Sequence, residues 1–230
     1  MEQEVYYVDQ TEVESRTFIH KVYGWMFLAL VITGLVAAYT VSSRPLLNLV
    51  FGGRFNFYGL ILAEFGMVIY LSRAIAKMST TVAMISFIAY SALNGLTMSV
   101  IFLVYTQTSI ATTFMVAGGT FGIMSLYGYF SKADLTSIGN LMFMGLVGVI
   151  IASVLNFFLQ SDALYWIITY VGIAVFIGLT AYDTQKIKKM SMMQMDGDVR
   201  SKAPIMGALS LYLDFINLFL LLLRLFGRRR

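Results

Sequence analysis

The chain has 230 residues, of which 59% are hydrophobic and 12% are charged, whereas a soluble domain usually carries about one quarter charged residues. This composition predicts an integral membrane protein. The absence of cysteine excludes disulfides, thiol nucleophiles and zinc–thiolate sites, and the single histidine excludes a histidine metal cluster. The net charge of +4 comes from basic residues that flank apolar runs, a pattern typical of membrane topology and not of nucleic-acid binding.

Residues 1–20 are predicted to form an acidic, soluble leader. Its first basic residue is Arg16, which follows five acidic ones: Glu2, Glu4, Asp9, Glu12 and Glu14. A cleavable signal peptide begins with positive charge, so this pattern is not a signal peptide. Charge runs are usually solvated, and a docking tail is the alternative.

Seven apolar runs follow, each near the length of about 20 residues that a membrane-spanning helix needs. They cover 22–42, 56–76, 81–105, 110–130, 138–159, 164–184 and 204–226. The runs are continuous and do not alternate, which excludes a β-barrel. Both prolines, Pro45 and Pro204, fall at predicted span edges. We therefore predict an all-α protein with one seven-span transmembrane domain at 21–226 and a basic tail at 227–230.

The basic residues predict that the N-terminus is cytoplasmic. In that orientation ten basic residues lie inside and six lie outside, as the positive-inside rule favours. The final "GRRR" opposes this orientation unless the last run re-enters the membrane. We favour a full crossing, because 23 residues are available for it.

Small residues predict where helices approach closely in lipid. Gly118, Gly119 and Gly122 cluster in the fourth run, and Ala203 and Gly207 lie four residues apart near the last one. We interpret both groups as packing contacts.

Asp214 lies about 15 Å into the last run if the helix begins near Pro204, at about 1.5 Å per residue. Ionisable groups at such depth are expensive and usually face an interior or a cavity. Ser210, Asp214 and Asn217 share one helical face with Gly207. We predict that this polar stripe packs against other helices.

Asp183 ends the sixth run within "GLTAYDTQKIKK", one turn after Thr180. The sixth and seventh runs are joined by an inner loop, so they can pack antiparallel and bring Asp183 and Asp214 together. Two carboxylates in one dry site cannot both ionise, so they would share a proton and titrate as a unit. We predict a proton-sensitive latch that Thr180, Ser210 and Asn217 support.

Glu64 lies in the second run, "ILAEFGMVIYLSR", with Arg73 nine residues further on. Glu64 is predicted to be a cation ligand, a proton acceptor or the ion-pair partner of Arg73; a satisfied structural hydrogen bond is the alternative. Asn94 and Thr97 form a stripe with Tyr90 in the third run, and we expect hydrogen bonds between helices there.

Three segments together resemble the transmembrane Bax-inhibitor-motif family, in a bacterial-type member: "ALSLYLDFINLFLLLLRLFG", "AYDTQKI" and the glutamate of the second run. The resemblance covers nearly the whole chain. It implies six helices wrapped around a central C-terminal helix, an aspartate pair at Asp183 and Asp214, and an acid at Glu64. It also implies a pH-dependent calcium leak, roles in stress survival and, for some bacterial members, modulation of a membrane-bound protease.

Three functions compete. The first is a pH-sensitive calcium leak in the bacterial inner membrane, with Asp183, Asp214 and Glu64 as calcium contacts, since calcium prefers carboxylate oxygens. The second is a regulator that binds another membrane protein, such as a protease, without transport. The third, an intramembrane aspartyl protease, is disfavoured because "GxGD" and "PAL" motifs are absent. We predict the leak, no enzyme, no cofactor and no nucleic-acid partner.

Overall fold

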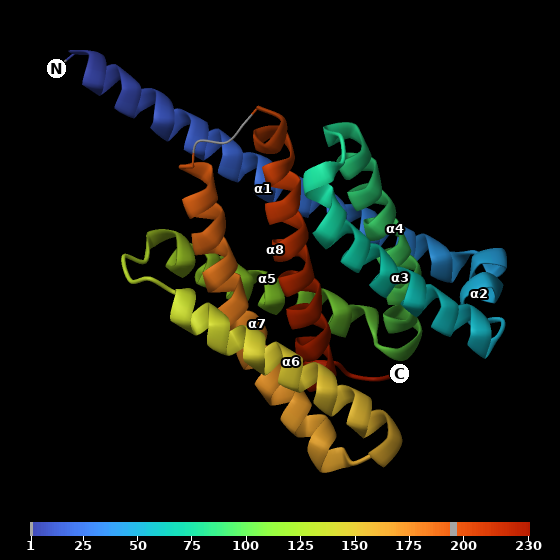
Figure 1. The fold of residues 1–230 in the computed structure, drawn as a ribbon. Coiled ribbons are helices and arrows are strands. Elements are labelled where there is room, and N and C mark those ends of the chain that lie inside the picture. Colours follow the sequence, from blue (N-terminus) through green and yellow to red (C-terminus); the bar gives the residue numbers. More distant parts are fainter. Residues whose placement is uncertain (1, 194–196) are drawn as a thin grey trace. The chain divides into compact units, whose positions relative to one another are not determined.

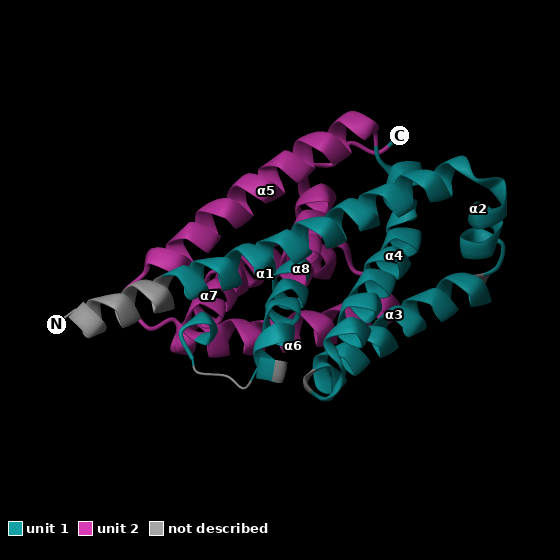
Figure 2. Ribbon diagram, turned by 90° about the horizontal axis from the view of Figure 1, so that it is seen from above, with its two compact units in different colours: residues 1–105, 190–212, 230 teal, residues 106–189, 213–229 magenta. Residues whose placement is uncertain are grey.

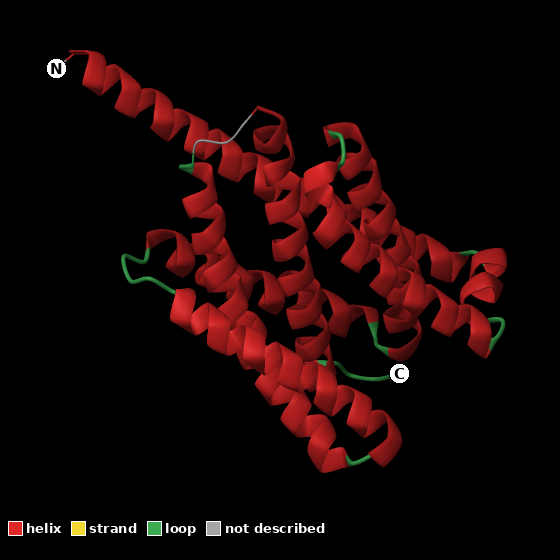
Figure 3. Ribbon diagram, viewed as in Figure 1, coloured by secondary structure: helices red, strands yellow, loops and turns green. Residues whose placement is uncertain are grey.

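The computed structural model describes residues 2–193 and 197–230, and within them it is helical without a strand (Figures 1 and 3). The elements in chain order are α1 (Glu2–Ser42), α2 (Arg44–Phe51), α3 (Arg54–Ala74), the short 3-10 helix η1 (Ile75–Lys77), α4 (Thr80–Val104), α5 (Gln107–Phe130), α6 (Thr136–Leu159), α7 (Asp162–Ser191) and α8 (Gly197–Phe226).

Seven helical segments of the described chain are long and apolar enough to cross a membrane. They are Val13–Ser42, Phe55–Ala74, Thr80–Val104, Gln107–Phe130, Thr136–Leu159, Asp162–Ser191 and Val199–Phe226. They coincide with the seven predicted runs, which confirms an all-α integral membrane protein. Hydropathy predicted these segments because a helix that crosses a bilayer needs about 20 consecutive apolar residues.

Two helix boundaries differ from the prediction. Helix α7 continues to Ser191, so Asp183 lies inside a helix and not at its end. Helix α8 begins at Gly197, so Pro204 lies in its interior and not at its edge. A proline only removes one backbone donor and is tolerated where neighbouring helices support the chain.

The leader belongs to the same helix as the first span, because α1 runs from Glu2 to Ser42. Near its middle, Glu14 forms an ion pair with Arg200, and the hydroxyls of Ser15 and Ser191 share a hydrogen bond of 2.6 Å. These contacts hold this part of the leader against the end of α7 and the start of α8. The side chains of residues 1–12 lie outside the described part of the chain.

The chain forms two compact units (Figure 2), and the first comprises residues 1–105, 190–212 and 230. In it α4 packs against both α1 and α3. Gly95 permits the contact with α1, since a Cβ there would lie 2.7 Å from Val36 Cβ and 2.8 Å from Thr33 O.

The second unit comprises residues 106–189 and 213–229. Helix α7 approaches its neighbours at glycines: a Cβ on Gly128 of α5 would overlap the carbonyl of Ala181, and one on Gly139 of α6 would overlap the ring of Tyr182. Phe215 of α8 packs edge-on between the rings of Phe114 and Phe121.

The prediction of close contacts at Gly118, Gly119 and Gly122 is wrong for this chain. A Cβ added at any of them would meet nothing within 4 Å. Gly119 is exposed and Gly118 and Gly122 are half-buried, so there is open space beside all three. Ala203 and Gly207 are buried as predicted.

Helix α8 is the most buried span. In its most apolar stretch 72% of the residues are buried, against 44% in α4 and 0% in α6. Such burial agrees with the central position that the family resemblance implies. Within α8, residues 197–212 belong to the first unit and residues 213–226 to the second.

Helix α8 is one continuous helix that is long enough for the predicted full crossing, since Val199–Phe226 is one of the seven candidate spans. Near its start, Ser201 shares a hydrogen bond of 2.6 Å with Thr80, the first residue of α4. Beyond its end, Arg230 N donates to the carbonyl of Val104, the last residue of α4, at 3.0 Å.

Candidate functional site

Asp214 lies in α8 with 5% of its surface exposed, and its Oδ2 is buried without a hydrogen-bond partner in the described structure. A buried polar atom normally has a partner, because leaving it unpaired costs about 1–3 kcal/mol. The structure therefore retains a carboxylate whose surroundings do not satisfy its charged form.

Asp183 of α7 lies near enough for its charge to act on Asp214. Asp183 is partly buried, and Lys186, one turn later, offsets some of its charge. Among the described residues no hydrogen bond joins the two carboxylates. Both predicted aspartates thus belong to the second unit and interact electrostatically, and a direct contact between their carboxylates stays a prediction.

The end of α7 after Asp183 is held by polar contacts to α5 and the α5–α6 loop. Gln185 accepts from Leu135 N at 2.9 Å and donates to Ala133 O at 2.8 Å. Lys188 donates to Tyr129 O at 2.7 Å and lies over the Tyr129 ring. These contacts hold the last turns of α7, which follow Asp183, against α5 and the α5–α6 loop.

Asp134 of the α5–α6 loop makes a further contact with this end of α7. It accepts a hydrogen bond from Lys189 at 2.7 Å and two more from the hydroxyl and amide of Thr136. The Lys189 bond and then the Thr136 bonds lower the pKa of Asp134 to about 2. Asp134 therefore stays ionised through any physiological pH.

The stripe residues do not hydrogen-bond to the pair in the described structure. Thr180 donates to Phe176 O at 2.7 Å and Asn217 donates to Leu213 O at 2.8 Å, each within its own helix. Ser210 lies in the part of α8 that belongs to the first unit. Their supporting role stays a prediction.

Glu64 of α3 forms a separate carboxylate site in the first unit. Its Oε1 accepts from Asn94 Nδ2 at 2.5 Å and its Oε2 accepts from Thr97 Oγ1 at 2.9 Å. The hydrogen bonds between helices predicted for this stripe of α4 are confirmed. Asn94 Oδ1 is buried without a partner, so the site keeps one unused acceptor.

The predicted ion pair between Glu64 and Arg73 does not form. Arg73 is exposed, and no ion pair joins the two residues in the described structure. Nine residues along one helix turn the chain by about 900°, which puts the two side chains on opposite faces about 13.5 Å apart along the axis.

No cluster of three or more His, Cys, Asp or Glu residues that could hold a metal ion occurs among the described residues. Asp183, Asp214 and Glu64 therefore do not form one resident metal centre there.

Two polar contacts of the first unit escaped prediction. Tyr212, fully buried two residues before Asp214, shares a hydrogen bond of 2.7 Å with Thr33 of α1, and its ring packs edge-on against Tyr90. Lys202 is 3% exposed and donates to Met78 O at 2.8 Å. The motif "LYLD" could have predicted a separate contact for Tyr212, because residues two apart point to nearly opposite faces of a helix and Tyr212 therefore cannot share the face of Asp214.

Comparisons with known proteins agree with this architecture. The family model described as "Inhibitor of apoptosis-promoting Bax1" matches residues 15–230. The chain is 52% identical to "Inner membrane protein YbhL" of Escherichia coli K12 over 223 residues, 96% of this chain and 95% of that protein. It is 45% identical over 215 residues to the uncharacterized protein RP147 of Rickettsia prowazekii, covering 94% of this chain and 91% of that one.

A third relative, an uncharacterized protein of Borreliella burgdorferi, is 44% identical over 214 residues, 93% of this chain and 92% of that one. The matched range of the family model includes residues of all seven candidate spans and both carboxylate sites. The chain therefore belongs to the Bax inhibitor family of integral membrane proteins.

Proposed function

We propose that this chain is a passive, pH-sensitive cation leak, with calcium as the permeant ion and with Asp183 and Asp214 as its switch. The observation that carries the proposal is the buried, unpartnered oxygen of Asp214 beside a second carboxylate. Such a site responds to a single proton, because the proton changes both the charge of the pair and its hydrogen-bonding capacity.

With one shared proton, the pair carries a single negative charge and a new donor. The protonated carboxyl donates to its neighbour and holds α7 against the second half of α8. This state closes the pathway. No catalytic step and no cofactor is involved.

When the proton leaves, two negative charges face each other in a site of low dielectric, and their repulsion pushes α7 and α8 apart. Lys186 offsets this repulsion from the side of Asp183 only. Two ionised carboxylates also attract a divalent cation and offer the oxygen ligands that calcium prefers. The leak should therefore increase as the pH rises.

The proposal is tested by calcium entry into liposomes that contain the purified chain, measured from pH 5.5 to 8. Wild type should pass more calcium at pH 8 than at pH 5.5, and Asp214→Asn should flatten this dependence. Asp134→Asn is the matched control, because it removes an exposed carboxylate of the same unit and should keep the pH response.

Two outcomes would overturn the proposal. No flux above empty liposomes at any pH would favour a regulator that binds another membrane protein, such as a protease, without transport. Cleavage of a membrane-spanning peptide that Asp214→Asn abolishes would favour an intramembrane protease.

We also infer a bacterial inner membrane with the N-terminus in the cytoplasm. The E. coli relative is an inner membrane protein by its name, and the basic residues favour this orientation. Alkaline phosphatase and green fluorescent protein fused after residue 230 test it. Phosphatase activity is expected, and fluorescence in its place would reverse the orientation.

A further inference from the structure

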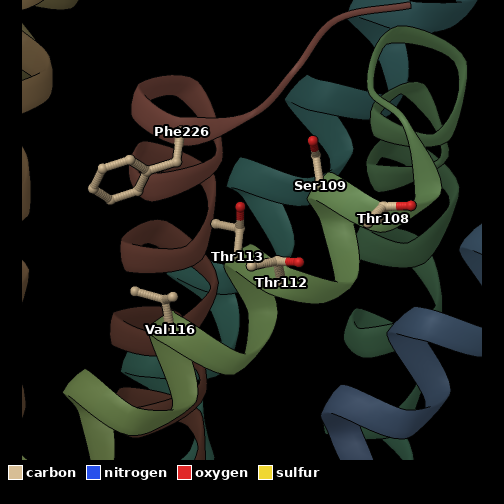
Figure 4. A pocket seen from close by; sticks show the side chains of 6 residues that line it. All are labelled: Thr108, Ser109, Thr112, Thr113, Val116 and Phe226. Carbon is tan, nitrogen blue, oxygen red and sulfur yellow. The ribbon is translucent and has the colours of Figure 1, made fainter.

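A groove lies at the end of the second unit where α8 finishes. Its volume is about 380 Å³, and it is lined by Thr108, Ser109, Thr112, Thr113, Val116 and Phe226 (Figure 4). Five of these residues come from the first three turns of α5, and Phe226 ends α8. The groove thus combines a row of hydroxyls with an apolar wall.

Two of these hydroxyls are available to a ligand. Those of Thr108 and Thr112 are exposed and make no hydrogen bond in the described structure, whereas Thr113 is buried. Ser109 Oγ is already used, since it accepts from Arg228 N at 3.0 Å and from Thr106 Oγ1 at 3.0 Å. The groove therefore offers two exposed donors with no partner among the described residues.

Three arginines lie at the same end of the unit, Arg224, Arg228 and Arg229. Backbone hydrogen bonds hold the tail there: Arg228 N donates to Ser109 Oγ, and Arg228 O accepts from Thr106 N at 3.1 Å. Arg229 reaches the hydroxyl of Tyr165 at 3.4 Å, and Arg224 lies 4.7 Å above the same ring. Arg224 and Arg228 form no ion pair with a carboxylate in the described structure, so positive charge remains uncompensated beside the groove.

The aromatic residues around these arginines are typical of a membrane–water interface. Trp166 stacks on Tyr170, and both are exposed, as is Phe226. Trp and Tyr gather at the depth of lipid headgroups, where an apolar ring and a polar tip are both satisfied. The groove and the arginines therefore lie at headgroup depth.

We propose that this groove binds an anionic phospholipid of the phosphatidylglycerol class. The arginines bind the phosphate, the free threonine hydroxyls donate to the glycerol and ester oxygens, and one acyl chain lies along Val116 and Phe226. Arginine is suited to phosphate, and juxtamembrane basic clusters attract anionic lipids.

This assignment also accounts for the basic residues that oppose the predicted orientation, because a bound anionic lipid neutralises them. The proposal does not depend on the leak.

The experiment measures phosphatidylglycerol binding to the purified full chain in detergent, by native mass spectrometry, against phosphatidylcholine as the neutral reference. Wild type should retain phosphatidylglycerol in preference to phosphatidylcholine. Arg224→Gln, Arg228→Gln and Arg229→Gln combined should weaken phosphatidylglycerol binding at least tenfold and leave phosphatidylcholine unchanged. The matched control neutralises three exposed lysines elsewhere, Lys21, Lys77 and Lys132, and should have no such effect.

A second variant tests the groove without changing charge. Thr108→Val with Thr112→Val keeps the shape of both exposed side chains and should weaken phosphatidylglycerol binding several-fold. Unchanged binding in both the arginine and the threonine variants would overturn the proposal, as would equal weakening in the lysine control. Displacement of the lipid by inorganic phosphate at equal concentration would assign the arginines to a soluble anion and would also overturn it.

Discussion

The two units treat a carboxylate within a membrane span in opposite ways. In the first, Glu64 receives one hydrogen bond at each oxygen, from Asn94 and Thr97. In the second, Asp214 is more deeply buried, has an unpartnered oxygen and interacts electrostatically with Asp183. A buried carboxylate whose oxygens all accept hydrogen bonds holds its neighbouring helices in one arrangement. A buried carboxylate with an unpartnered oxygen makes the packing of its helices depend on whether it carries a proton.

This difference separates a structural polar site from a switch. Glu64 is matched by donors on the neighbouring helix, so α3 and α4 are joined at any pH at which Glu64 is ionised. Among the described residues, no hydrogen-bond donor reaches the carboxylates of Asp183 and Asp214. The following substitutions test this difference between the two units.

The largest effect is expected from Gly128→Ala, because its Cβ would overlap the backbone carbonyl of Ala181, two residues before Asp183. Backbone cannot move aside as a side chain can, and overpacking of this kind costs about 3 kcal/mol. Thermal unfolding in detergent should show a clear loss of stability. Gly122→Ala, on the open face of α5, is the control and should be neutral or slightly stabilising; equal losses in both variants would contradict the packing of α5 on α7.

Removal of a donor from the first unit should have the next largest effect. Asn94→Ala leaves Glu64 Oε1 without its hydrogen bond, and an unsatisfied buried charge costs about 2 kcal/mol. The variant should unfold at a lower temperature than wild type. If the loss were no larger than for Ser153→Ala, which removes an exposed hydroxyl bonded within α6, Glu64 would not be a satisfied structural site.

Asp214→Asn tests the second unit in the opposite direction. Since it removes one of two repelling charges, it should raise thermal stability at pH 8 and change it little at pH 5.5. The expected gain is about 1 kcal/mol, the net size of a typical buried hydrogen bond that the amide can form. Thermal unfolding at the two pH values measures it, and a loss of stability at pH 8 would show that the ionised pair is stabilising.

Asp134→Asn is expected to have the smallest effect, because Asp134 is exposed. Its pKa of about 2 in the folded chain lies below the unfolded value of 3.8. The stabilisation from its bonds to Lys189 and Thr136 is therefore present above about pH 4 and is lost as the pH falls toward 2. The unfolding temperatures of wild type and Asp134→Asn should differ slightly at pH 7, and the difference should shrink as the pH falls toward 2. A difference that grows on acidification would contradict this.

The sequence by itself determined the seven spans and the depth of the carboxylates, because hydropathy and distance along a helix are local properties. It also predicted that Asn94 and Thr97 would bond between helices, since a polar stripe in lipid needs a partner. It could not identify that partner. Arg73 was the nearest charge in sequence to Glu64, yet it lies on the opposite face of α3.

Tertiary structure alone decided which faces meet. Gly118, Gly119 and Gly122 had the spacing of a close helix contact, but the contacts form at Gly128 and Gly139, where α7 presents Ala181 and Tyr182. Whether Asp183 and Asp214 are neighbours also depended on the register of α7 against α8. A spacing rule describes one helix, whereas close approach and charge pairing depend on the rotation and offset of two.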